Sequence, residues 1–243
     1  MTDEGRLLYD HVSKAFEALN EGEEKLKRSI ELGVGQLKIG VSSTLCKYML
    51  LPYLKEFIHR NPHISISIEC QSTNETLKLL DDDKIDIGLI GKPTSLKTFN
   101  FYYLDNIEDI FVTTKDYLRN LSARGVKKSE ILQNSTLMLL DKGNMTRKYI
   151  DDYLQENQIH VKDSIDISNM DLLIDFAKIG VGVACVIKSI VSKELADGTL
   201  IEIPLGIPIH KREVGFAYKE SSKLSTSLQT FIKFYESYTP EDF

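Results

Sequence analysis

Three consecutive hydroxyl side chains, Ser42, Ser43 and Thr44, stand where a predicted strand at residues 36–41 gives way to a predicted helix. The amino end of a helix presents unpaired N–H groups and a partial positive charge of about half a unit, which together suit a carboxylate or a phosphate. One hydroxyl is enough to cap the helix, and capping alone accounts for about 1 kcal/mol of stability. Because three hydroxyls are present, we expect this turn to bind a ligand as well as to cap the helix.

Other polar side chains follow predicted strands further along the chain. They are Asn144, Thr146 and Arg147, then Ser168 and Asn169, and also Lys92, which comes after the strand at residues 85–90. Asn144 or Thr146 could cap a helix while Arg147 pairs with an anion, whereas Lys92 could add a positive charge or remain solvated. A mixture of hydroxyl, amide and one or two cations favours a small polar anion over an apolar ligand. We therefore treat these residues as candidate ligand contacts.

Motifs of common enzyme classes are missing from the sequence. It has no Gly-x-Ser-x-Gly, no P-loop and no Gly-x-Gly-x-x-Gly after a strand. His59 and His63 have a spacing that could suit zinc, but Asn61 and Pro62 interrupt the helix between them. The acidic run at residues 81–83 is typical of a solvated helix end. We expect no enzymatic activity, no metal and no cofactor.

The elements that must position these residues form two successive α/β series. The first has strands at residues 36–41, 63–70 and 85–90 with helices at 45–60 and 74–83; the second has strands at 136–140, 164–167 and 181–187 with helices at 144–156 and 170–179. Further strands are predicted at 99–104, 109–114, 200–203 and 212–218, and a last helix at 224–237. Strands that alternate with helices through short connections indicate parallel pairing with right-handed crossovers.

Two such series predict an α/β fold of two Rossmann-like lobes. The last strand and helix need a sheet to cover, so we assign residues 34–107 and 209–243 to lobe I and residues 108–208 to lobe II. The chain would then cross between the lobes twice. Two crossovers make a hinge, with a cleft at the carboxyl ends of both sheets.

Residues 1–33 are assigned to a separate dimerisation helix. Its apolar positions form a narrow seam: Leu8, Val12, Ala15, Leu19, Leu26 and Ile30. A narrow seam suits packing along a partner helix, although an ordinary helix folded back on its own lobe is the alternative.

Composition restricts the function classes further. The 243-residue chain has a net charge of −6, which argues against direct binding of nucleic acid by its folded lobes. It has neither an apolar run of about 18 residues nor a signal peptide, so we expect a cytoplasmic protein. Cys46, Cys70 and Cys185 each lie within an apolar run and are expected to be buried, reduced thiols.

Six short motifs occur in an order that resembles LysR-type transcriptional regulators. They are Thr2-Asp3-Glu4-Gly5, Gln36-Leu37-Lys38-Ile39-Gly40, Leu50-Leu51-Pro52, Asp86-Ile87-Gly88, Ala177-Lys178-Ile179-Gly180-Val181-Gly182 and Gly198-Thr199-Leu200. The match spans the linker helix and the effector-binding domain, whereas a winged helix-turn-helix head is missing. One departure is Val186-Ile187, where the family commonly has Leu-Pro.

The resemblance implies a fold like that of type 2 periplasmic binding proteins and a bacterial sensor module. A small polar or anionic metabolite, such as an organic anion or an amino-acid-like molecule, would bind between the lobes and alter the geometry of a homodimer or homotetramer. It further implies that residues 45–60 of one subunit lie near residues 221–237 of another, and that DNA is bound only through a head domain of a longer regulator. The alternatives are a transporter's solute-binding protein, which would need export, and a small two-lobed enzyme, which would need a catalytic set.

Overall fold

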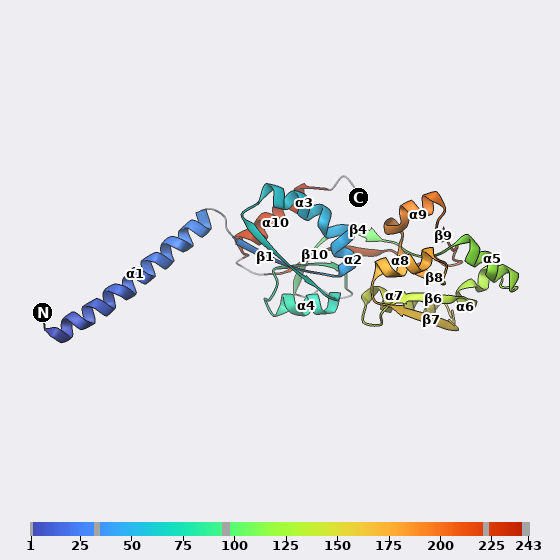
Figure 1. The fold of residues 1–243 in the computed structure, drawn as a ribbon, viewed down its shortest axis with the longest axis horizontal. Helices are drawn as coiled ribbons and strands as arrows, with labels where there is room; N and C mark the ends of the chain where they lie inside the picture. Colours follow the sequence, from blue (N-terminus) through green and yellow to red (C-terminus); the bar gives the residue numbers. More distant parts are fainter. Residues whose placement is uncertain (1, 32–34, 94–97, 221–223, 240–243) are drawn as a thin grey trace.

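The computed structural model describes residues 2–31, 35–93, 98–220 and 224–239. It contains two α/β lobes that lie side by side, and a long helix that projects from the first of them (Figure 1). Within the described ranges no helix is long and apolar enough to cross a membrane.

Lobe I is built on a five-stranded sheet with the order β2-β1-β3-β10-β4. Its strands are β1 (Gly35–Val41), β2 (Ile64–Cys70), β3 (Ile87–Gly91), β4 (Phe99–Ile107) and β10 (Arg212–Lys219). β1 pairs in parallel with β2 and β3, as the alternation of strands and helices predicts. β10 runs antiparallel to both β3 and β4, so the sheet is mixed.

The helices of lobe I are α2 (Ser43–Leu45), a π-helical turn (Cys46–Leu50), α3 (Leu51–Arg60), α4 (Thr73–Asp81) and α10 (Thr226–Ser237). Phe57 of α3 packs edge-on against Phe231 of α10 at 4.9 Å between ring centroids, and Phe231 in turn contacts Phe216 of β10. All three rings are fully buried. The last strand and helix therefore belong to the first sheet, as expected from the sequence.

The π-helical turn is a departure from the single helix predicted over residues 45–60. In this turn the N–H of Leu51 bonds to the carbonyl of Cys46, five residues earlier. Pro52, the next residue, has no N–H to donate. A regular helical bond to the carbonyl of Tyr48 is thus impossible, which favours a wider turn at this point.

Lobe II is built on a second five-stranded sheet with the order β7-β6-β8-β5-β9. Its strands are β5 (Asp109–Thr113), β6 (Thr136–Leu140), β7 (Asp163–Ile167), β8 (Val183–Ile187) and β9 (Ile201–Glu202). Its helices are α5 (Lys115–Ala123), η2 (Lys128–Glu130), α6 (Ile131–Asn134), α7 (Met145–Glu156), α8 (Met170–Lys178), η3 (Lys188–Val191) and α9 (Ser192–Asp197). The α5, α6 and α9 helices were not among the predicted elements.

The chain passes between the two sheets from β4 to β5 and again from β9 to β10. The predicted two-lobe α/β fold with two crossover segments is confirmed by this topology. The precise division into residues 1–33, 34–107 with 209–243, and 108–208 stays a prediction.

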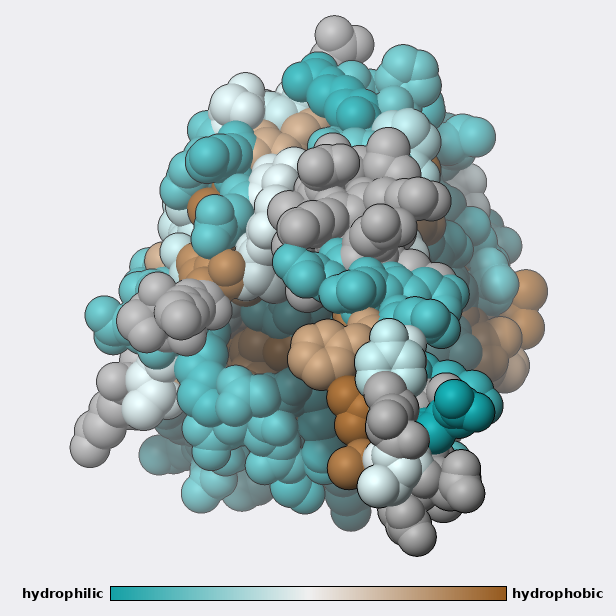
Figure 2. Space-filling view, turned by 90° about the vertical axis from the view of Figure 1, so that its left-hand side faces the viewer, coloured by the Kyte–Doolittle hydropathy of each residue, from teal (hydrophilic) through white to brown (hydrophobic). Residues whose placement is uncertain are grey.

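Helix α1 (Asp3–Glu31) extends away from the lobes instead of folding back on them (Figure 1). Leu8, Val12 and Leu19 of the predicted seam are exposed, whereas the side chains of Leu26 and Ile30 lie outside the described part of the chain. Seen from the α1 end, the surface is mostly hydrophilic with small apolar groups (Figure 2). An unpartnered apolar seam is what a helix that pairs with another helix would show.

The cysteines differ in part from expectation. All three are free thiols, and Cys185 is buried, but Cys46 is half-buried and Cys70 is exposed. Cys70 is the last residue of the edge strand β2, whose final three residues are all exposed, so its thiol lies at the surface. The prediction of a buried thiol at Cys70 is therefore wrong.

Candidate functional site: the cleft between the lobes

A cavity of about 590 Å³ opens between the lobes and takes its walls from both. Lobe I contributes hydroxyls from the start of α2 and α4, lobe II contributes the start of α7, and the second crossover contributes charged side chains. Polar and charged residues that line the cavity include Ser42, Thr44, Ser72, Lys92, Asn144, Thr146, Lys148, Tyr149, Lys211 and Arg212. The cavity thus lies where the carboxyl ends of the parallel strands meet, the usual position of ligands in open α/β sheets.

The sequence-predicted candidates divide into two groups. Ser42, Thr44, Lys92, Asn144 and Thr146 line the cavity, whereas Ser43, Arg147, Ser168 and Asn169 are not among its lining residues. Both groups include helix caps: Ser42 accepts from the N–H of Leu45 at 3.3 Å, Asn144 from that of Thr146 at 2.8 Å, and Asn169 from that of Leu172 at 2.9 Å. Capping therefore accounts for these three side chains whether or not a ligand is bound.

Lys92 is ion-paired across the sheet rather than simply solvated. Its ammonium lies 2.5 Å from a carboxylate oxygen of Glu213 in β10. Thr44 differs, because its hydroxyl makes no hydrogen bond to any described residue although it lines the cavity. Thr44 is therefore a polar side chain in the cleft that is available to a ligand.

Arg147 lies inside lobe II instead of facing an anion in the cleft. Its guanidinium bonds to Asp151 at 2.8 Å, to the carbonyl of Leu140 at 2.9 Å and to Asp166 at 2.5 Å. The side chain is 7% exposed. The Asp151 and Asp166 carboxylates compensate the burial of its charge and raise its pKa. Arg147 holds α7 to the ends of β6 and β7, which is a structural role.

Arg212, which the sequence did not single out, is an arginine that does line the cavity. It begins β10 at the second crossover, and its Nε and Nη2 bond to both carboxylate oxygens of Asp109, the first residue of β5, at 2.8 and 2.9 Å. Nη2 also reaches the hydroxyl of Thr146 at 3.2 Å, and the guanidinium lies 5.1 Å from the ring centre of Tyr149. One arginine therefore ties both crossovers to the amino end of α7.

The Asp109 side chain is fully buried, and burial raises the pKa of its carboxyl while Arg212 opposes that rise. A buried carboxylate of this kind stays charged only next to a well-placed cation. The neighbouring Glu108 is more exposed and bonds to Lys188 and Lys211, which lower its pKa. The hinge is thus a charged cluster with one buried pair at its centre.

Ser72 is a second residue that sequence reasoning missed, although a signal for it exists. It follows β2 and caps α4 by accepting from the N–H of Glu75 at 3.3 Å. A hydroxyl between a strand and a helix is the same pattern that singled out Ser42. Arg212 carries no comparable local signal, because its partner Asp109 is 103 positions away.

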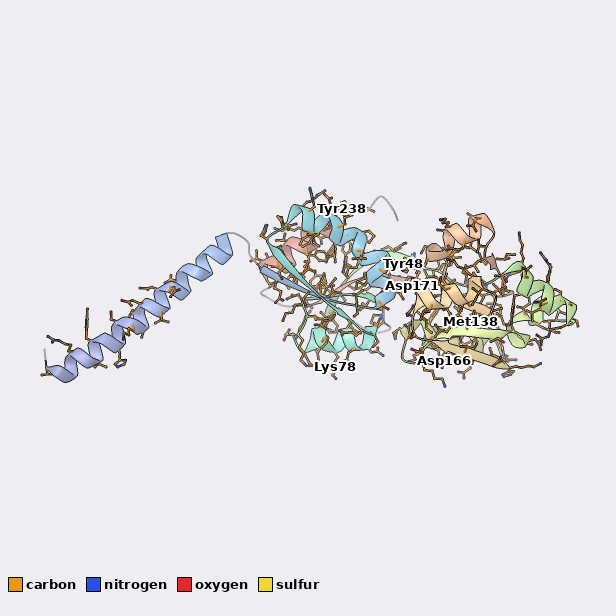
Figure 3. The ribbon with its side chains drawn as sticks, viewed as in Figure 1. Tyr48, Lys78, Met138, Asp166, Asp171 and Tyr238 are labelled. Carbon is orange, nitrogen blue, oxygen red and sulfur yellow. The ribbon has the colours of Figure 1, made fainter. Side chains whose placement is uncertain are left out.

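A bridge between the lobes stands outside the hinge. Lys47 and Tyr48, from the π-helical turn of lobe I, both donate to one carboxylate oxygen of Asp171 in the first turn of α8, at 2.7 and 2.5 Å. Figure 3 shows Tyr48 and Asp171 meeting at the junction of the lobes. We call Lys47, Tyr48 and Asp171 the interlobe bridge. Both donors lower the pKa of Asp171.

Replacing Asp171 with asparagine is expected to loosen the contact between the lobes with little loss of stability. The side chain is 48% exposed, so solvent screening limits the contribution of the pair to below ~1 kcal/mol. Because the pKa of Asp171 is lowered in the folded state, this contribution is present at neutral pH and is lost as the pH falls below ~3.9 through the folded-state value. Small-angle X-ray scattering should report a wider distribution of lobe arrangements for Asp171→Asn.

Asp175→Asn is the matched control, because Asp175 is an exposed carboxylate on the same helix. Identical scattering from the two variants would contradict a bridging role for Asp171.

The fold and the cleft define a two-lobed ligand-binding domain of the α/β class. Residues 31–239 match the family model of the LysR substrate binding domain, and the chain belongs to this family. The resemblance to LysR-type regulators that the motifs suggested is thereby confirmed.

Relatives and solved structures agree with this assignment. The HTH-type transcriptional regulator YeiE of Escherichia coli (strain K12) is 23% identical over 235 residues, which cover 96% of this chain and 78% of YeiE. The Synechocystis PCC6803 CcmR regulatory domain, solved in complex with 2-PG, has a TM-score of 0.69 at 19% identity and covers 82% of this chain and 95% of its own. The effector binding domain of QuiR, solved in complex with shikimate, has a TM-score of 0.66 at 16% identity, with 82% of this chain and 94% of that chain covered.

Proposed function

We propose that the cleft binds a small organic anion and that this chain is the sensor part of a LysR-type transcriptional regulator. The observation that carries the proposal is the geometry of Arg212. Its Nε and Nη2 are held by Asp109 and Thr146, while Nη1 makes no hydrogen bond to any residue of the described ranges. Nη1 is the atom that a side chain at Gly91, also in the cleft wall, would meet first. A fixed guanidinium with a free edge suits a carboxylate or phosphate.

Other groups in the cleft favour the same ligand class. The cavity wall is more cationic than anionic. It contains Lys92, Lys148, Lys211 and Arg212 but only two carboxylates, Asp152 and Glu213. The start of α4 and the start of α7 face the cavity from opposite lobes, each with unpaired N–H groups. CcmR in its complex with 2-PG and QuiR in its complex with shikimate offer a precedent for polar ligands in domains of this fold.

A ligand that touches both lobes changes the balance between lobe arrangements only if it binds them unequally. A 10-fold difference in affinity corresponds to about 1.4 kcal/mol. We propose that this shift alters the geometry of the oligomer, and that α1 passes the change to the DNA-binding part of the regulator.

Thr44→Val tests the cleft assignment, because it removes a hydroxyl that has no hydrogen-bond partner among the described residues and keeps the shape of the side chain. We expect 2-PG, shikimate or inorganic phosphate to raise the melting temperature of the wild-type chain. A probe at 100 times its Kd should stabilise the fold by about 2.7 kcal/mol. In Thr44→Val most of this stabilisation should be lost at the same probe concentration.

Ser43→Ala is the control, since Ser43 is next to Thr44 but does not line the cavity. If Ser43→Ala weakens binding as much as Thr44→Val, or if no anion of a broader organic-acid screen stabilises the chain, the proposal fails.

We further propose a dimer formed through two exposed apolar strips. Lobe I presents Leu51, Ile58 and Ile68 along α3 and the edge strand β2, and lobe II presents Leu172, Phe176 and Ile179 along α8. The earlier expectation, that α10 faces the partner's residues 45–60, is less well supported. The apolar side chains of α10 are buried in its own lobe, and residues 221–223 lie outside the described part of the chain.

Phe176→Glu should shift the protein from dimer toward monomer, because it places a charge in the apolar strip of α8. The expected change is at least 10-fold in the dimer dissociation constant, measured by sedimentation equilibrium. Lys233→Glu, on the exposed face of α10, is the matched control and should leave the dimer unchanged. Dissociation of the dimer by Lys233→Glu but not by Phe176→Glu would instead favour contact through α10.

A further inference from the structure

A second cavity, of about 340 Å³, lies beside the cleft. Its floor is apolar and buried, and it consists of Leu45, Met49, Ile107 and Ile187. Its rim is polar and includes Asp105 and the exposed Ser189. An enclosure of ~300 Å³ or more with an apolar floor and a few polar groups is the usual form of a small-molecule site.

The charge of this cavity is opposite to that of the cleft. Asp105 is the one charged side chain among the described residues that line it, whereas the cleft wall carries four cations and two carboxylates. One oxygen of Asp105 accepts from the N–H of Asn106 at 2.7 Å. None of the lysines and arginines in the described ranges forms an ion pair with Asp105. The carboxylate is therefore open to an external cation.

We propose that this cavity binds an organic ammonium ion with an apolar body. The body lies on the buried floor, where it is removed from water, and the ammonium group lies at the rim against Asp105. Charged hydrogen bonds between an ammonium and a carboxylate are stronger than neutral ones. The carboxylate also disfavours the anions that the cleft attracts, so the two cavities select ligands of opposite charge.

The two cavities share part of their walls. Thr44, Leu45, Ile107 and Ile187 line both, and Ile107 is the last residue before the first crossover. The second cavity also contacts Tyr48 of the interlobe bridge. An ammonium ligand therefore touches the hinge and the bridge, so its binding changes the affinity of the cleft for its own ligand. The cleft ligand then changes the affinity for the ammonium by the same factor.

Isothermal titration calorimetry at pH 7 tests the site with 2-phenylethylammonium and phenylacetate, a pair of similar shape and opposite charge. We expect the ammonium to bind the full wild-type chain at least 10-fold more tightly than phenylacetate. Asp105→Asn should weaken ammonium binding at least 10-fold, and Ser189→Trp, which fills the mouth of the cavity, should abolish it. Asp81→Asn, an exposed carboxylate outside the cavity, is the control and should change nothing.

Equal binding of the two probes, or ammonium binding that survives both Asp105→Asn and Ser189→Trp, would overturn the proposal. Melting curves establish that each variant is folded, and Asp105→Asn keeps the shape of an exposed side chain. Titration of shikimate into the same variants separates this inference from the cleft assignment. If shikimate does not bind but ammonium binding depends on Asp105, the proposed function of the cleft fails while the second cavity keeps its assignment.

Discussion

Arg212→Met is expected to lower the free energy of unfolding by about 3 kcal/mol and to reduce anion binding in the cleft by at least 10-fold. The substitution leaves the Asp109 carboxylate fully buried without its bidentate partner, and removal of one member of a buried ion pair costs ~3–5 kcal/mol. It also removes the free Nη1 edge that we assign to the ligand. Urea unfolding and titration of shikimate or phosphate measure the two effects separately.

The pH dependence of this variant has a defined sign. Without Arg212, burial raises the pKa of Asp109 further above its unfolded value, so the folded state binds more protons than the unfolded state. Stability is then greatest below the unfolded pKa of ~3.9 and falls as the pH rises toward the folded value. We expect Arg212→Met to lose more stability relative to wild type at pH 7 than at pH 5.

Lys211→Met is the matched control for Arg212→Met. Lys211 is the preceding residue and pairs with Glu108, but its side chain is 59% exposed, so the loss should be below ~1 kcal/mol. Equal destabilisation by the two variants would show that the buried pair does not hold the hinge. The double variant Asp109→Asn with Arg212→Met should recover part of the stability, because no buried charge is left unpaired.

Gly215→Ala is expected to be the most damaging small substitution in lobe I, with a loss of about 3 kcal/mol or more. Gly215 lies in β10 between β3 and β4, next to a shift in the strand register. A β-carbon there would clash with the carbonyl oxygen of Tyr102 and lie 2.8 Å from the ring of Phe101. The carbonyl oxygen of Tyr102 cannot move away without breaking the pairing of β10 with β4.

Gly206→Ala provides the comparison, because an added β-carbon meets nothing within 4 Å at that position. Urea unfolding should give a small change for Gly206→Ala and a large loss for Gly215→Ala. If Gly215→Ala fails to fold, its soluble yield relative to Gly206→Ala gives the same comparison. Similar behaviour of the two variants would contradict the close approach of β4 and β10.

Much of the fold could be predicted from local patterns. The alternating residues of β2 and the apolar runs of β3 and β8 identify strands, and Ser42, Asn144 and Asn169 mark the helix starts that they cap. Such signals depend on neighbours within a few positions, so they are readable in one sequence. Helix α9 was missed because its six residues lack an amphipathic repeat and a side-chain cap.

The cleft was predicted less completely, because sequence signals act over a few positions whereas cleft contacts join residues that are far apart in the chain. Hydroxyls after a strand could be located, and Ser42 and Thr44 do line the cavity. Lys92 was also placed correctly, but the positions of the two arginines could not be predicted, because a charged side chain binds whichever carboxylate the fold brings near. Arg147 forms an ion pair with Asp166 inside lobe II, and Arg212 forms one with Asp109 at the hinge.

The sequence by itself determined the order of strands and helices, the two α/β series and the hydroxyl-bearing turns, since periodicity and capping act over a few residues. Only the tertiary structure decided that Arg212 lines the cleft while Arg147 does not, and which residues join the lobes. Asp171 lies 124 positions from Lys47 and 123 from Tyr48, and no local pattern connects residues so far apart. Packing of the two sheets brings them together, and the hinge chemistry follows from that packing.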